Sequence, residues 1–130
     1  MRKDTKNWVA LTDYDIETAL HMLATERYLY VIFLCHLALE KILKAHVAEV
    51  IQDVPIKTHD LIYLVKKCEL EVPEKYLDFI GKINTASIPT RYPDDLQRSL
   101  KEYPKSVAKD YLSQTTEIVE WLKHHPNLSK

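Results

Sequence analysis

The sequence predicts an all-α fold, an antiparallel up-and-down bundle of about five helices that forms one domain over residues 1–130. A single glycine argues against most β-folds, because hairpins and bulges rely on glycine for positive φ angles. The six prolines fall between apolar stretches of helical periodicity, where they mark helix ends. A chain of this length buries roughly two thirds of its unfolded surface, so it needs no disulfide or structural metal to hold a core.

The first part of the chain contains neither glycine nor proline before Pro55. One helix over most of this stretch would measure about 70 Å, whereas a domain of this size has a radius of gyration of about 14 Å. We therefore expect one turn, near residues 25–28, between helices at about residues 5–25 and 27–51. The second helix is apolar nearly all round in its first half, which predicts a central position. The first helix has a predicted apolar face made of Trp8, Leu11, Ile16, Ala19, Leu20 and Leu23.

The prolines define the remaining elements. After Pro55, Thr58 is the predicted N-cap of a short third helix that carries Asp60 in its first turn. A fourth helix is expected from Pro73 to about residue 88, and a fifth from Pro104 to Pro126. Residues 89–103 form a connection of a length that is often functional. The structural interpretation of the same segment is an ordered connection, capped by Asp94 and Asp95, with a short helix at about residues 96–101.

Composition narrows the classes of function. The net charge of −1 provides no whole-molecule field for nucleic acid or an anionic membrane, so any such binding must be local. Because the P-loop and the dinucleotide-binding loop each require more than one glycine, a chain with a single glycine contains neither motif. The longest apolar run, residues 29–35, is too short to span a bilayer, and the N-terminus lacks the apolar core of a signal peptide. Two cysteines without a Cys-x-x-Cys pairing suit a reducing compartment, so we expect a cytoplasmic protein without membrane association.

The second helix carries a polar stripe within its apolar surroundings. His36, Glu40 and Lys44 follow one another at i, i+4 and i+8, with Lys41 beside them. The structural interpretation is a half-buried ion pair between Glu40 and Lys44. The functional interpretation is that the stripe faces a cleft in which the lysines meet phosphate oxygens, and His36 with Glu40 could then act as an oriented general base.

A second polar pair, His59 and Asp60, opens the predicted third helix. A helix N-terminus with a histidine can bind an anion, although the same pair is often a simple capping arrangement. No histidine or cysteine spacing is typical of a metal site, and no nucleophile lies beside a base in the sequence. We therefore expect neither a metal nor a cofactor, and the sequence marks no catalytic residue.

Five segments, taken in order, resemble the HEPN domain, the higher eukaryotes and prokaryotes nucleotide-binding domain. They are Trp8-Val9 through residues 15–19 (DIETA), Tyr28, residues 36–45 (HLALEKILKA), residues 58–61 (THDL) and residues 91–94 (RYPD). The resemblance covers nearly the whole chain. It implies a helical domain with a four-helix-bundle core, commonly a homodimer with a polar cleft near the dimer interface. Stand-alone prokaryotic members are often encoded beside a minimal nucleotidyltransferase, in toxin–antitoxin-like pairs whose HEPN protein is a metal-independent ribonuclease.

The resemblance implies that the ribonuclease branch of that family is marked by an arginine followed, about four to six residues on, by a histidine. None of the arginines of this chain, Arg2, Arg27, Arg91 and Arg98, has a histidine at that interval. The resemblance therefore favours a binding module for a nucleotide or nucleic-acid phosphate, paired with a nucleotidyltransferase. The residues expected to bind the ligand are Arg91, Tyr92, Lys41, Lys44 and His59, supported by His36, Glu40, Asp60 and Asp94.

Two alternatives remain open at this point. One is a ribonuclease with a degenerate motif, in which Arg91 acts with His59 or His36. The other is a purely structural or interaction protein, in which Glu40, Lys44, His59 and Arg91 lock the helices and the connecting segment together.

Overall fold

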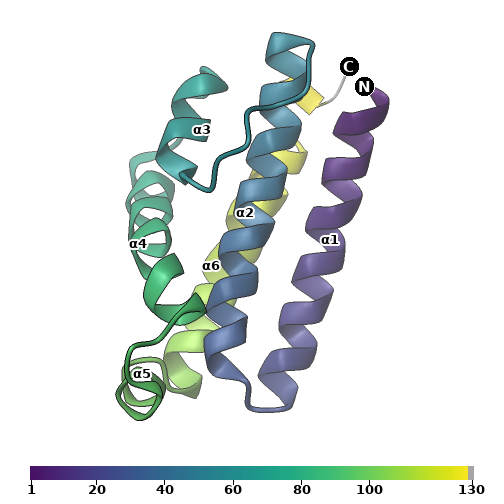
Figure 1. The fold of residues 1–130 in the computed structure, drawn as a ribbon. Coiled ribbons are helices and arrows are strands. Elements are labelled where there is room, and N and C mark those ends of the chain that lie inside the picture. The colour runs from purple at the N-terminus through teal and green to yellow at the C-terminus, as the bar shows by residue number, and fades with distance from the viewer. Residues whose placement is uncertain (129–130) are drawn as a thin grey trace.

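The computed structural model describes residues 1–128, which contain six α-helices, one 3₁₀ helix and no strand (Figure 1). The helices are α1 (Lys3–Ala24), α2 (Tyr28–Ile51), α3 (Leu61–Lys67), α4 (Glu74–Arg91), α5 (Leu96–Glu102), α6 (Lys105–Lys123) and the 3₁₀ helix η1 (Pro126–Leu128). The predicted all-α fold is confirmed. The additional helix relative to the expected five is the short α5.

Helix α2 is the centre of the bundle, as its sequence predicts. It packs against α1, α6, α4, α3, α5 and η1 (Figure 1). Its side chains are buried on every face, and Ile32, Leu39, Ile42 and Leu43 are completely inaccessible to solvent. A helix that is apolar nearly all round has no face suited to water, so it is covered on all sides.

The turn between α1 and α2 lies where it was expected, at residues 25–27. Glu26 adopts a left-handed conformation with φ 65°, and the amide of Arg27 donates to the carbonyl of Met22 at 2.8 Å. This bonding pattern usually places glycine at the left-handed position. In a chain with one glycine, Glu26 serves instead, and Gln52 and Glu69 do the same after α2 and α3.

Two predicted boundaries were wrong. Helix α4 continues through Pro89 to Arg91 instead of ending near residue 88. Because Pro89 lies in the last turn, its missing amide costs one bond and the helix still closes, with the amide of Tyr92 donating to the carbonyl of Ile88. Thr58 does not cap α3. The carboxylate of Asp60 accepts from the amides of Ile62 and Tyr63, so Asp60 is the N-cap and the helix starts at Leu61.

The face of α1 that meets α2 is more polar than predicted. Leu20 is exposed, and the residues of α1 that are buried are Thr5, Thr12, Asp15 and Ala19. Asp15 therefore lies in the α1–α2 interface, where a charge needs a partner.

Within residues 1–128, no helix combines the length and apolar character that crossing a bilayer requires.

Candidate functional site

Glu40 is the centre of a polar network that joins α2 to the start of α3. Its side chain is 6% exposed, and each carboxylate oxygen has a different partner. One oxygen accepts from Lys44 Nζ at 3.0 Å, and the other accepts from His59 Nδ1 at 2.7 Å. The predicted ion pair between Glu40 and Lys44 is therefore present. Because Nδ1 of His59 donates to Glu40, its Nε2 is the ring nitrogen left for solvent or a ligand.

His36 provides a second tether to the same residue. Its Nε2 lies 3.0 Å from the backbone carbonyl of His59, and since a carbonyl can only accept, Nε2 carries the proton. His36 is completely buried, and burial lowers the pKa of its imidazole, although the Glu40 carboxylate opposes this effect. Two side chains one helical turn apart on α2 thus hold both the ring and the backbone of His59.

Arg91 lies at the end of α4, close enough to His36 for its positive charge to lower the pKa of that histidine further. Its guanidinium carbon lies 4.5 Å from the centroid of the Phe33 ring, a cation–π contact. The Nε atom of Arg91 is buried and has no hydrogen-bond partner within residues 1–128. Over the same residues, Arg91 has no carboxylate within ion-pair distance.

A groove of about 300 Å³ brings these groups together between the start of α3 and the last turns of α4. It is lined by His59, Asp60, Asn84, Ser87, Ile88, Arg91 and Tyr92. The side chain of His59 is 68% exposed, and Tyr92 is 70% exposed. The groove therefore presents an imidazole, a guanidinium and a phenol ring to solvent.

One wall of the groove is fixed by hydrogen bonds between α3 and α4. The amide of Asn84 donates to the Asp60 carboxylate at 3.2 Å, and the amide oxygen of Asn84 accepts from the backbone of Leu61 at 3.0 Å. One oxygen of the Asp60 carboxylate, Oδ1, thus accepts from Asn84 and from the two amides that it caps at the start of α3. These bonds tie the start of α3 to α4 at this wall.

The two predicted lysines lie outside this groove. Lys44 is buried beside Glu40, with its ammonium group 5.5 Å from the centroid of the Trp8 ring. Lys41 Nζ lies 2.8 Å from a carboxylate oxygen of Asp15 on α1. Asp94 is exposed in the connection between α4 and α5 and does not line the groove. Of the predicted set, the structure brings together His59, Arg91 and Tyr92, with Asp60 in the wall and His36 and Glu40 behind.

Three of the four α4 residues of the groove, all except Arg91, were missed in the sequence. Asn84, Ser87, Ile88 and Arg91 follow at i, i+3, i+4 and i+7, which is one face of a helix. This polar face becomes visible once α4 is extended through Pro89. An expected helix end near residue 88 separates Arg91 from the rest of its own face.

The groove suits a small anion. A guanidinium without a carboxylate partner provides N–H donors in a planar fork, which matches phosphate or carboxylate oxygens. The exposed nitrogen of His59 can accept or deliver a proton, because its ring is oriented by Glu40 in the way that a general base is oriented by a third group.

Comparison with known proteins gives a consistent family and fold. The sequence model of the HEPN domain matches residues 5–125. TT1696 from Thermus thermophilus has a similar structure, with a TM-score of 0.79 and 21% identity over 94% of this chain and 98% of that one. ST0689, described as an archaeal HEPN homologue, has a TM-score of 0.74 and 21% identity over 95% and 97% of the two chains. No curated protein matches the sequence significantly. The match over nearly the whole chain shows that this protein belongs to the HEPN domain family.

Proposed function

We propose that this protein binds the phosphate group of a nucleotide or nucleic acid in the groove between α3 and α4. The observation that carries the proposal is Arg91, a guanidinium without a carboxylate partner within residues 1–128, which lines the same groove as His59. Phosphate oxygens accept charge-assisted hydrogen bonds from both side chains. Tyr92 adds an exposed aromatic ring on which a base or ribose can pack.

The charge balance of the chain agrees with a local site of this kind. Since the net charge is −1, attraction of a phosphate depends on the groups at the groove rather than on a general field. Glu40, behind the groove, is held between Lys44 and His59, and Asp60 in the wall keeps its negative charge while one of its oxygens caps α3. Arg91 is left without a carboxylate partner within residues 1–128.

Titration calorimetry of the purified protein with ATP, GTP and a short RNA tests this function. Arg91→Ala should weaken binding by about tenfold or more, because a charge-assisted hydrogen bond contributes roughly 1.5–3 kcal/mol. Arg98→Ala is the matched control, since Arg98 lies on α5 outside the groove and pairs weakly with Glu102 at 3.9 Å. Equal affinities for the two variants, or no binding by the wild type, would contradict the proposal.

A second candidate function is RNA cleavage, favoured by the Glu40–His59 arrangement. In such a reaction His59 Nε2 takes the proton of a 2′-hydroxyl, and the 2′ oxygen attacks the adjacent phosphorus. The bond to the 5′ oxygen breaks, and that oxygen takes a proton from water. Arg91 would stabilise the charge that develops on the phosphoryl oxygens. Cleavage should disappear in His59→Gln and in a substrate with a 2′-deoxy nucleotide at the cut site, while His124→Gln remains active. RNA that stays intact with the wild-type protein would exclude this function.

For partners, we propose a homodimer and a minimal nucleotidyltransferase, as in the toxin–antitoxin-like pairs that the family resemblance implies. Exposed Ile88 and Tyr92, which both line the groove, support an interface there, because exposed apolar side chains that gather in one place often mark an interaction site. Light scattering should give twice the chain mass for the wild type and a smaller value for Ile88→Glu. Co-purification with a nucleotidyltransferase encoded beside the gene, and relief of any growth defect by it, test the second partner.

A further inference from the structure

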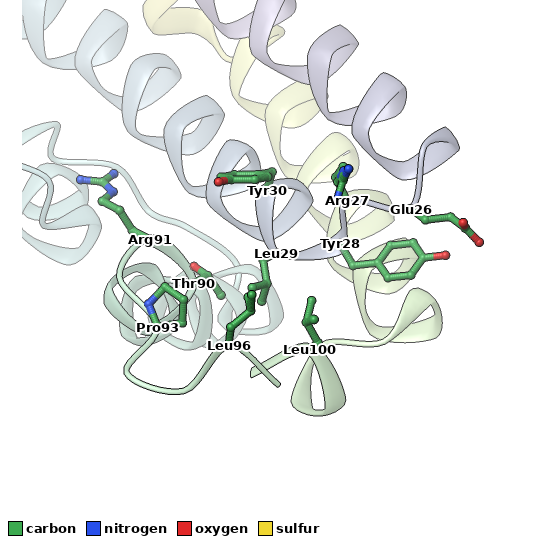
Figure 2. Close-up of a pocket in the computed structure, with 10 residues that line it drawn as sticks. All are labelled: Glu26, Arg27, Tyr28, Leu29, Tyr30, Thr90, Arg91, Pro93, Leu96 and Leu100. Carbon is green, nitrogen blue, oxygen red and sulfur yellow. The ribbon is translucent and has the colours of Figure 1, made fainter. Parts of the chain in front are cut away.

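A second cavity, of about 250 Å³, lies on the other side of Arg91 (Figure 2). It is enclosed by the α1–α2 turn, the first turn of α2, the end of α4 and helix α5. Leu29, Leu96 and Leu100 come together at its centre in Figure 2, and Pro93 closes one side. The cavity is therefore mainly apolar, with two tyrosines, Tyr28 and Tyr30, in its lining.

Arg91 lines both this cavity and the α3–α4 groove. In Figure 2 its guanidinium points away from Leu96 and Leu100, so the stem borders the cavity while the charged end lies beyond it. An anionic group bound at the guanidinium is thus placed next to an apolar compartment. A ligand with a phosphate at one end and a flat, largely apolar group at the other would use both sides of the same arginine.

The volume and the lining residues of the cavity indicate which kind of flat group fits it. Small-ligand pockets commonly measure about 300–1,000 Å³, so about 250 Å³ suits one ring system rather than a whole nucleotide. Tyrosine rings are platforms on which any base can stack. Glu26 and Arg27 also line the cavity, but in Figure 2 the Glu26 carboxylate lies beyond Tyr28 and points away from the three leucines. A nucleobase has the size of one ring system and flat faces that stack on a tyrosine, whereas an aliphatic chain has no face to stack.

We propose that a single nucleotide unit binds across Arg91, with its phosphate in the α3–α4 groove and its base in the cavity formed by α2, α4 and α5. This assignment rests on the proposed phosphate-binding function and adds the site of the base. It makes α5 part of the binding site.

Calorimetry with AMP and with ribose 5-phosphate tests the assignment, because the two probes differ in the base alone. AMP should bind about tenfold or more tightly than ribose 5-phosphate, the gain expected from stacking one base. Leu100→Trp fills the cavity and should reduce the affinity for AMP to that for ribose 5-phosphate, while leaving the latter unchanged. Leu77→Trp is the matched control, since Leu77 is 38% exposed on α4 and Leu100 is 40% exposed on α5.

The outcomes separate the two proposals. Equal affinities of the wild type for the two probes, or an unchanged preference for AMP in Leu100→Trp, would overturn the base site and leave the phosphate site standing. Failure of both probes to bind would overturn phosphate binding, and the base site with it. Leu96→Trp blocks the same cavity from the other end of α5 and replaces Leu100→Trp if circular dichroism shows that the latter is unfolded.

Discussion

Two clusters of charged residues lie on either side of Glu40, and they differ in how their positive charges are compensated. In the α1–α2 interface, Lys41 and Lys44 each have a carboxylate oxygen within 3.0 Å and are largely buried. In the α3–α4 groove, Arg91 has no such partner within residues 1–128, and His59 keeps one ring nitrogen free for solvent. A buried charge must be paired inside the protein, whereas a charge beside a groove remains available to a ligand.

The largest expected effect comes from removing Glu40, the residue that the two clusters share. Glu40→Ala leaves the ammonium of Lys44 buried without its carboxylate and releases the ring of His59. Loss of one partner of a buried pair costs about 3–5 kcal/mol in the free energy of unfolding, which urea denaturation measures. Glu117→Ala breaks an exposed pair with Lys75 and should cost less than about 1 kcal/mol. If both variants lose the same free energy of unfolding, the Glu40–Lys44 pair contributes no more to stability than an exposed ion pair does.

The buried histidines give the next largest effect, as a pH dependence of stability. His46 on α2 is completely buried, its Nε2 donates to the carbonyl of Leu122 at 2.8 Å, and burial lowers its pKa to about 4. The unfolded chain therefore binds more protons between pH about 6.5 and about 4, so stability falls as the pH is lowered through that range. The loss attributable to His46 amounts to roughly 3 kcal/mol.

Urea denaturation at pH 7 and pH 4.5 measures this difference. His46→Gln should lose less stability between the two values than the wild type does. His124→Gln, at an exposed position, should follow the wild type. His36 contributes in the same direction, because burial also lowers its pKa. An identical pH dependence of stability in His46→Gln and His124→Gln would show that protonation of His46 does not cause the loss of stability in acid.

A direct comparison of the two clusters uses the same replacement in each. Lys44→Met removes the charge that compensates Glu40 and should cost more than about 2 kcal/mol, on the order of the penalty for breaking a buried pair. Arg91→Met removes a cation–π contact with Phe33 and should cost about 1 kcal/mol or less. Melting temperatures of the two variants measure the contrast. A larger loss for Arg91→Met would favour the purely structural interpretation of Arg91.

The sequence predicts the fold well because its strongest signals are local. The central position of α2 follows from its apolar run, and the turn after α1 follows from the length of a stretch without proline. The face of α1 was less predictable, because the partner of Asp15 is Lys41 on another helix. A hydrophobic pattern does not show that a buried carboxylate has its cation elsewhere in the chain.

The candidate site was predicted in part for the same reason. His36 and Glu40 lie one turn apart, so their common face could be read directly, and the Glu40–Lys44 pair follows from that spacing. Whether His59 would meet Glu40 depends on the path of residues 52–60, which has no periodicity. The role of Arg91 depended on Pro89, since a proline in the last turn of a helix and a proline at the start of a loop look alike in sequence.

The smallest expected effect comes from Asp60, the negatively charged residue in the wall of the α3–α4 groove. Asp60→Asn removes a negative charge beside the bound phosphate but keeps an oxygen that can accept from the amides of Ile62 and Tyr63. Asparagine is as good an N-cap as aspartate, so the free energy of unfolding should change by less than about 0.5 kcal/mol. Binding of AMP should strengthen by about two- to fivefold, because one partly screened repulsion is lost. Asp94 is exposed and lies outside the groove, so Asp94→Asn should leave the free energy of unfolding and the affinity for AMP unchanged. An equal gain in affinity from the two variants would mean that phosphate binding depends on the net charge of the protein and not on this groove.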